Sequence, residues 1–267
     1  MKKLHISFDS SGWLYLFHFG VASFVRNNVK DDIDIVYSGT SSGSLCATAM
    51  SLEMDMDDTK HKIMNIHNKC DSPMSTYLNL FNETKNLLKN ILPKNAHEQV
   101  RGKLYIGVTY IDENANILEE NILKGHVIGS FHSKEHLLDS LHASCHIPIL
   151  NQFVPIEVTS KGNTLYCYDG GFTVPMASTL IQNASDTIFI NISAYPRFLF
   201  NVEVNPNVHF IKLPIDLPLT WGIVPPRKET LELIYELGYS FTNNYCGENL
   251  NDYFECKRPT NLTNLTK

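Results

Sequence analysis

The chain has 267 residues, of which 43% are hydrophobic and 19% are charged, and its formal net charge is -6. This length suits one large α/β domain or two small ones, and the apolar share is that of a globular protein with a sizeable core. The acidic balance gives no reason to expect a nucleic-acid partner.

The start of the chain alternates as a strand does, and charges interrupt it before an apolar stretch develops, so we expect no signal peptide. No run of about 18 apolar residues occurs, so no membrane-spanning helix is expected. The six cysteines are scattered and form no C-x-x-C pair, which favours free buried thiols in a reducing compartment. We therefore expect a cytoplasmic protein.

Short strands and helices alternate in the N-terminal part of the chain. Leu4 to Phe8 is predicted to be a strand, and Trp13 to Asn27 a buried helix that is too short to span a membrane. Ile33 to Tyr37 is predicted to be a second strand, and a tight turn and a helix of small residues follow it. This order predicts a parallel sheet with helices on its faces.

The rest of the chain continues the alternation. Helices are predicted over 57–70 (capped by Asp57 or Asp58), 76–92, 133–145, 174–184 and 228–241. Strands are predicted over 103–110 and 117–122, which would form a hairpin, and over 165–168, 186–192 and 208–213. No repeat or linker composition divides the chain, so we expect a single domain over residues 1–267. Its catalytic core would span roughly 1–195, with 196–267 as an extension packed on it.

The clearest chemical signature is Gly39-Thr-Ser-Ser-Gly43, a G-x-S-x-G pattern between a predicted strand and a helix. In this context the pattern predicts a nucleophile elbow. Gly39 and Gly43 would let the backbone bend sharply and let a substrate approach closely. Ser41 would lie at a helix N-terminus, where free N–H groups and the helix dipole favour negative charge. We predict that Ser41 attacks an acyl carbonyl.

Acyl transfer also needs a base and donors for an oxyanion. The best candidate base is Asp169, which ends a predicted strand and precedes Gly170 and Gly171, whose small size leaves space beside it. A carboxylate is a weaker base than imidazole, so partial burial must tune its pKa. Ser11 and Gly12, between the first strand and the buried helix, would direct backbone N–H groups at an anion. Each piece alone is also a common turn or helix cap.

The order of the three pieces resembles the patatin-like phospholipase family, whose pattern is a Gly-rich oxyanion loop, then G-x-S-x-G, then D-G-[GA]. Within it, the chain is most similar to the branch of adipose triglyceride lipase and adiponutrin. The resemblance covers most of the chain, through Ile6 to Ala22, the elbow with Ala47-Thr-Ala49 behind it, Ala143 to Pro148, and Pro225 to Tyr239.

This resemblance implies a three-layer α/β/α fold with a mostly parallel central sheet. It also implies a Ser-Asp dyad without a catalytic histidine, a metal or a cofactor, in which Ser41 is the nucleophile and Asp169 the general base. Ser11 and Gly12 would supply the oxyanion hole. The implied activity is hydrolysis of lipid esters, such as phospholipids, acylglycerols or retinyl-type esters, through an acyl-enzyme. The protein would work at the periphery of a membrane or a lipid droplet.

Two positions depart from the family pattern, because Ser10 and Tyr15 stand where the family usually has glycine. A side chain at position 10 matters if the loop needs a positive φ there. Tyr15 adds bulk where the family's helix packs closely. The departures leave open a slower enzyme, or a protein that binds lipid surfaces without catalysis.

Further alternatives stay open. An α/β-hydrolase with a Ser-Asp-His triad could use His209, which follows Asp169 in the chain but lies in an apolar predicted strand. A transacylase would pass the acyl group to an alcohol in place of water. The cluster of His142, Cys145 and His146 is better explained by core and helix-end roles than by a metal site, because a matching fourth ligand is missing. The helix that begins near Tyr77 is a candidate lid facing a lipid surface.

Overall fold

The computed structural model describes residues 2–70, 72–113, 122–148, 153–181, 186–195 and 207–256. Within them a central sheet has the strand order β5-β6-β3-β2-β1-β7-β8, and β4 also pairs with β3. The strands are β1 Lys2–Phe8, β2 Ile33–Thr40, β3 Leu104–Ile111, β4 Leu123–Ile128, β5 Ile156–Ser160, β6 Asn163–Asp169, β7 Thr187–Ser193 and β8 Val208–Lys212.

The helices fall between these strands. The α-helices are α1 Tyr15–Asn28, α2 Ser42–Ser51, α3 Met56–His67, α4 Pro73–Ile91, α5 Ala96–Gln99, α6 Lys134–Ser144 and α7 Lys228–Asn249. Short 3-10 helices are η1 Gly12–Leu14, η2 Gly170–Phe172, η3 Ala177–Leu180 and η5 Leu219–Gly222.

The sheet is mostly parallel. Strands β3, β2, β1, β7 and β8 run in one direction, whereas β4, β5 and β6 form antiparallel pairs at the β3 side. Parallel neighbours need long crossover connections, which α1 supplies between β1 and β2, and α2 to α5 supply between β2 and β3. The predicted α/β class, with helices flanking a mostly parallel sheet, is confirmed.

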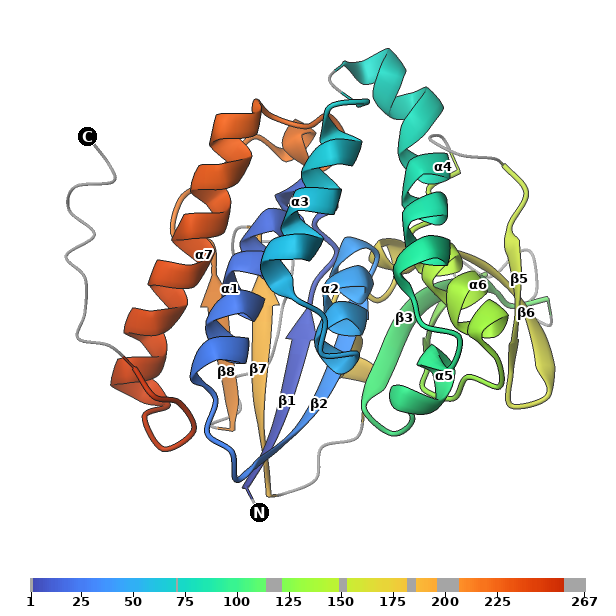
Figure 1. Cartoon of the computed structure of the whole chain (residues 1–267). Coiled ribbons are helices and arrows are strands. Elements are labelled where there is room, and N and C mark those ends of the chain that lie inside the picture. Colours follow the sequence, from blue (N-terminus) through green and yellow to red (C-terminus); the bar gives the residue numbers. More distant parts are fainter. Residues whose placement is uncertain are drawn as a thin grey trace.

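The two faces of the sheet are covered differently. Helices α1, α2, α3 and α7 lie in front of the parallel strands in Figure 1. Successive side chains of a strand point to opposite faces, and the end of β1 shows this. The ring of Phe8 lies 5.6 Å from the ring of His18 in α1, whereas Ser7 Oγ accepts a hydrogen bond from the Ser178 N–H in η3. The core therefore lies between the sheet and the α1 layer, and η3 covers the opposite face.

Helix α7 packs closely on α1, beside the strand β8 (Figure 1). At this contact, a Cβ on Gly238 would lie 2.4 Å from the backbone oxygen of Phe17. The apolar face of α7 is buried there, with Leu231 and Ile234 almost inaccessible to solvent. The chain beyond residue 195 thus contributes both a strand to the sheet and a helix to its cover.

Several predicted boundaries were wrong for identifiable reasons. Helix α3 is capped by Asp55, whose carboxylate accepts the Asp58 N–H, and not by Asp57 or Asp58. Helix α4 begins at Pro73 because Ser72 and Ser75 form a capping box around it. The second strand of the hairpin lies later than predicted, at β4; of the predicted range 117–122, residues 117–121 are outside the described residues.

Two predicted helices also differ from the structure. The segment after Val174 forms only the short 3-10 helix η3, and residues 182–185 lie outside the described residues. Helix α7 continues eight residues beyond the predicted end at Phe241, to Asn249. Its added turns contain the buried residues Thr242 and Cys246, so packing outweighs the weak helix propensity of this polar stretch.

Candidate active site

Ser41 lies alone between strand β2 and helix α2, in a strained backbone conformation. Its φ is 53° and its ψ is -130°, a combination that costs free energy for any residue with a side chain. Three hydrogen bonds hold it there. The Ser41 N–H donates to Ser144 Oγ at 2.8 Å, Ser144 Oγ donates to the Gly107 oxygen at 2.7 Å, and Ser44 Oγ donates to the Ser41 oxygen at 2.6 Å. The geometry is that of the predicted strand-turn-helix elbow.

The two glycines of the elbow serve close packing. A Cβ on Gly39 would lie 2.2 Å from the Gly43 oxygen, and a Cβ on Gly43 would lie 2.3 Å from the Asp9 oxygen. Neither glycine has a positive φ, because Ser41 itself takes that conformation. The sharp bend that the sequence suggested for the glycines is therefore carried by the serine, and the glycines let three backbone segments meet.

Asp169 meets Ser41 directly. Ser41 Oγ donates to Asp169 Oδ2 at 2.6 Å, and the Gly171 N–H donates to Asp169 Oδ1 at 2.7 Å. The carboxylate is 4% exposed. Burial raises its pKa from 3.8 to about 6, although the hydrogen bonds from Ser41 and Gly171 oppose the rise. The carboxyl group is therefore ionised at neutral pH and is a better base than an exposed carboxylate.

Strand register explains how residues 128 positions apart come together. Thr40 at the end of β2 is paired with Gly107 of β3, and the next residue of β3, Val108, is paired with Asp169 of β6. Because β6 runs antiparallel to β3, its last residue lies beside the middle of that strand. Gly170 opens the 3-10 helix that follows, so the chain turns away directly after the carboxylate.

The candidate oxyanion loop has its positive φ at Gly12, where φ is 53°. A Cβ there would lie 1.7 Å from the backbone oxygen of Gly222, so only glycine fits. Ser10 has no positive φ, which means that its side chain brings no backbone strain. The Ser11 N–H is engaged, since it donates to Ser42 Oγ at 3.2 Å. Gly12 lines the same cavity as Ser41, whereas the Ser11 amide could serve an anion only if Ser42 turned away.

A buried polar network supports this loop from behind. His18 Nε2 lies 2.8 Å from Asp9 Oδ1, and both side chains are fully buried. The other ring nitrogen, Nδ1, lies 3.3 Å from Ser11 Oγ, which in turn lies 3.0 Å from Ser42 Oγ. The hydroxyl of Tyr195 donates to the Ser11 oxygen at 3.2 Å. Ser11 is therefore fixed through both its backbone and its side chain.

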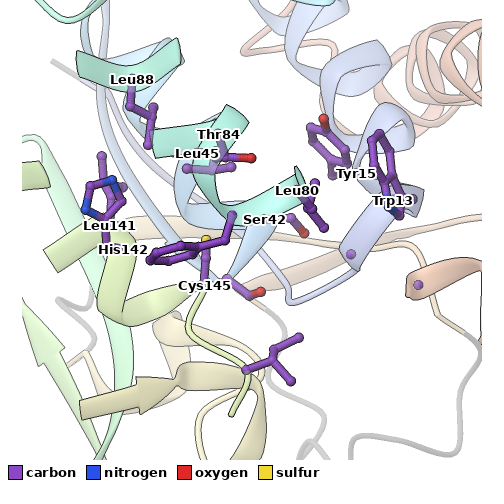
Figure 2. A pocket seen from close by; sticks show the side chains of 15 residues that line it. Trp13, Tyr15, Ser42, Leu45, Leu80, Thr84, Leu88, Leu141, His142 and Cys145 are labelled. Atoms are coloured by element: carbon purple, nitrogen blue, oxygen red, sulfur yellow. The ribbon is translucent and has the colours of Figure 1, made fainter. Parts of the chain in front are cut away.

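An apolar cavity of about 90 Å³ opens at Ser41 (Figure 2). Its lining comes from the turn before α1, the start of α2, successive turns of α4 and the end of α6, and includes Trp13, Leu45, Leu80 and Leu141. Such a cavity, apolar with a few polar groups at one end, is typical of ligand sites. Helix α4, the candidate lid, forms one wall of it.

Some members of the site were not singled out from the sequence. His142 and Cys145, taken as core or helix-end residues, line the cavity at the end of α6. Burial lowers the pKa of His142 to about 4 and raises that of the Cys145 thiol, so both are neutral at pH 7. Ser144, whose Oγ accepts the hydrogen bond from the Ser41 N–H, lies between these two residues in the sequence. For Ser144 and Cys145, the available signal was that the segment 143–148 resembles the one that precedes the aspartate in the family.

The alternatives find less support. His209 Nδ1 lies 3.1 Å from the Tyr245 hydroxyl, and His209 is not part of the cavity lining. In the part of the chain that the structure describes, no three side chains of His, Cys, Asp or Glu gather as a metal site would require. Among those same residues, no helix combines the length and the apolar character needed to cross a membrane.

Comparison with known proteins gives a matching family model and similar curated proteins. Residues 6–180 match the family model described as patatin-like phospholipase. The chain is 25% identical over 255 residues to patatin-like phospholipase domain-containing protein 4 of Homo sapiens, covering 91% of this chain and 96% of that protein. It is 25% identical over 175 residues to omega-hydroxyceramide transacylase of Homo sapiens, covering 63% of this chain but only 30% of that protein.

A solved structure shows a similar fold. The crystal structure of VipD from Legionella pneumophila aligns with a TM-score of 0.50 over 92% of this chain and 67% of that chain, at 11% sequence identity.

Proposed function

The chain belongs to the patatin-like phospholipase family, and from that premise we propose that it is a lipid acyl hydrolase with Ser41 as nucleophile and Asp169 as general base. The proteins it is similar to include one named as a patatin-like phospholipase domain-containing protein and one named as a transacylase. Both names support acyl chemistry on lipid esters.

One observation carries the proposal. The Ser41 hydroxyl donates a 2.6 Å hydrogen bond to a buried carboxylate whose pKa is raised to about 6, at the end of an apolar cavity. A nucleophile needs a base within hydrogen-bond reach, and a base works best when its pKa lies near the operating pH. The apolar lining suits an acyl chain, since burying each methylene group is favourable by about 0.8 kcal/mol.

The proposed reaction has two halves. Ser41 Oγ attacks the ester carbonyl carbon while its proton moves to Asp169 Oδ2, and the tetrahedral oxyanion faces the Gly12 N–H and the N-terminus of α2. The proton then passes from Asp169 to the leaving alkoxide as the C–O bond breaks, which gives an alcohol and an acyl-enzyme. A water attacks the acyl-enzyme, loses its proton to Asp169, and the released Ser41 oxygen recovers that proton as the fatty acid leaves.

Labelling with a fluorophosphonate probe tests whether Ser41 is activated. The wild-type protein should be labelled and should release fatty acid from lipid esters, and Ser41→Ala should lose both. Ser51→Ala is a matched control, because Ser51 is about as buried as Ser41 but lies at the far end of α2, where its hydroxyl donates to the Ala47 oxygen of that helix. Absence of labelling, or hydrolysis that survives Ser41→Ala, would favour a lipid-binding protein without this catalytic centre.

A transacylase is the second candidate function. The likeness to omega-hydroxyceramide transacylase favours it, since that protein's name implies acyl transfer to an alcohol. The acyl-enzyme would be the same, and only the acceptor would differ. Product analysis with a monoacylglycerol or a long-chain alcohol present separates the two: an ester product identifies transfer, and free fatty acid alone identifies hydrolysis.

A further inference from the structure

A second apolar cavity, of about 40 Å³, lies next to the one at Ser41. It is enclosed by α1, α2, α3 and α4, and its own lining includes Phe19, Ala49, Ile63 and Ile66. The first and second cavities share four lining residues, which are Tyr15, Leu45, Thr84 and Leu88. These four side chains, labelled in Figure 2, therefore form a partition between two apolar spaces.

The two cavities follow one another along helices α2 and α4. On α2, Ser42 lines the first cavity, Leu45 lines both, and Ala49 lines the second. Helix α4 repeats this order, since Leu80 lines only the first cavity and Leu92, just after the helix, lines only the second. Because the helical rise is 1.5 Å per residue, the second cavity lies farther along α2 from Ser41 than the first.

Tyr15 is the bulkiest of the four partition residues. Its side chain is 8% exposed and packs edge-to-face on Phe19, with ring centroids 5.7 Å apart. It also stands where the related family usually has glycine, so the partition owes its largest member to a departure of this chain. A smaller residue at position 15 would remove the largest member of this partition.

We propose that Tyr15 limits the length of the acyl chain that the site accepts, and that the second cavity is an extension closed off by its ring. The inference rests on the proposed function, because it places the carbonyl end of an acyl chain at Ser41. A short or medium acyl chain fills the first cavity and ends against the partition, whereas a longer chain must displace it.

The test compares kcat/KM for p-nitrophenyl butyrate, octanoate, laurate and palmitate in wild type and Tyr15→Ala. The ratio of palmitate to octanoate should rise on the order of tenfold or more in Tyr15→Ala, because each buried methylene is worth a factor of about 4 and two further methylenes in the second cavity already exceed tenfold. Ile63→Phe fills only the second cavity, so Tyr15→Ala combined with Ile63→Phe should return the ratio to the wild-type value. An unchanged ratio in active Tyr15→Ala protein would overturn the proposal.

Matched controls separate this effect from general damage. Tyr37 is also 8% exposed but lines neither cavity, so Tyr37→Ala should lower stability without changing the chain-length ratio. Tyr15→Leu is a milder opening variant if Tyr15→Ala fails to fold.

Binding of fatty acids of the same lengths to Ser41→Ala, with and without the Tyr15 change, does not depend on turnover. If the Tyr15 change lets Ser41→Ala bind longer fatty acids, but the wild-type protein hydrolyses no ester, the chain-length limit is supported and the proposed hydrolase activity is refuted. If the wild-type protein hydrolyses esters, but the Tyr15 change leaves the preferred fatty-acid length unaltered, the hydrolase activity is supported and the chain-length limit is refuted.

Discussion

The pH dependence of activity tests the proposed role of Asp169. Burial raises the pKa of its carboxyl from 3.8 to about 6, and only the ionised form can accept a proton from Ser41. We expect kcat/KM to be half-maximal near pH 6, to level off about one unit above it, and to fall about tenfold per unit well below it, as a single essential base does. Asp169→Asn should lower kcat by about 10²–10⁴ at pH 8, the usual contribution of a general base.

The same shift predicts a change in stability with a defined sign. The folded protein holds the Asp169 proton more tightly than the unfolded chain, so this contribution is complete below pH 3.8 and is lost as the pH rises through 6. The shift of about two units corresponds to about 3 kcal/mol. The free energy of unfolding of Asp169→Asn, measured relative to wild type, should therefore rise by about this amount when the pH is raised from 4 to 8. The acceptor that asparagine loses, for Ser41 or Gly171, is a constant cost of about 1–3 kcal/mol at every pH.

Denaturant unfolding of both proteins at several pH values measures that difference, while titration of other groups cancels. Asp139→Asn is the matched control, because burial also raises the pKa of Asp139 although this residue of α6 lies outside the cavity lining. In Asp139→Asn, the fall of kcat/KM at acidic pH should stay centred near pH 6, as in wild type. A limb near pH 4 in wild type, or full activity in Asp169→Asn, would refute the assignment of Asp169 as base.

Two further substitutions test the loop that faces Ser41. Gly12→Ala would place a Cβ 1.7 Å from the Gly222 oxygen and should abolish activity and lower the melting temperature strongly, whereas Gly102→Ala, with φ of 73° but open space, should cost only about 1 kcal/mol. Similar melting temperatures would contradict this packing. Ser42→Ala removes the acceptor that occupies the Ser11 N–H and should raise kcat if that amide is an oxyanion donor; a lower kcat would show that Ser42 supports the site instead.

Local patterns in the sequence were sufficient for the first strands, helices and the elbow. The alternation from Leu4 to Tyr37 and the G-x-S-x-G turn each depend on residues close in sequence, and β1, α1, β2 and α2 follow that order. The start of α4 was also readable, because Ser72 followed by Pro73 is the signal of a capped helix start. A proline also commonly follows the end of a helix, so Pro73 alone does not distinguish the end of the helix predicted to finish at Cys70 from the start of the next one.

The contacts of the site depend on packing between distant segments. The sequence singles out Asp169, but its distance to Ser41 follows from an antiparallel pairing of β6 with β3 that no local pattern specifies. The same holds for Ser144, whose hydroxyl fixes the Ser41 backbone, and for His142, whose place in the cavity depends on the contact between α6 and α4. Assigning a role to such residues requires the register and the helix packing.

The departure at Ser10 is explained by the loop on the other side of the site. The conformation that requires glycine lies at Gly12, so Ser10 brings no strain, but its side chain occupies space beside Gly171. A Cβ on Gly171 would lie 2.9 Å from Ser10 Oγ and 2.9 Å from Asp169 Oδ1. The family pattern D-G-[GA] admits alanine at this position, yet here the serine and the glycine share one space. The loop that contains Ser10 and the turn that follows Asp169 are thus sterically coupled, and a substitution in one must be judged with the residue it meets in the other.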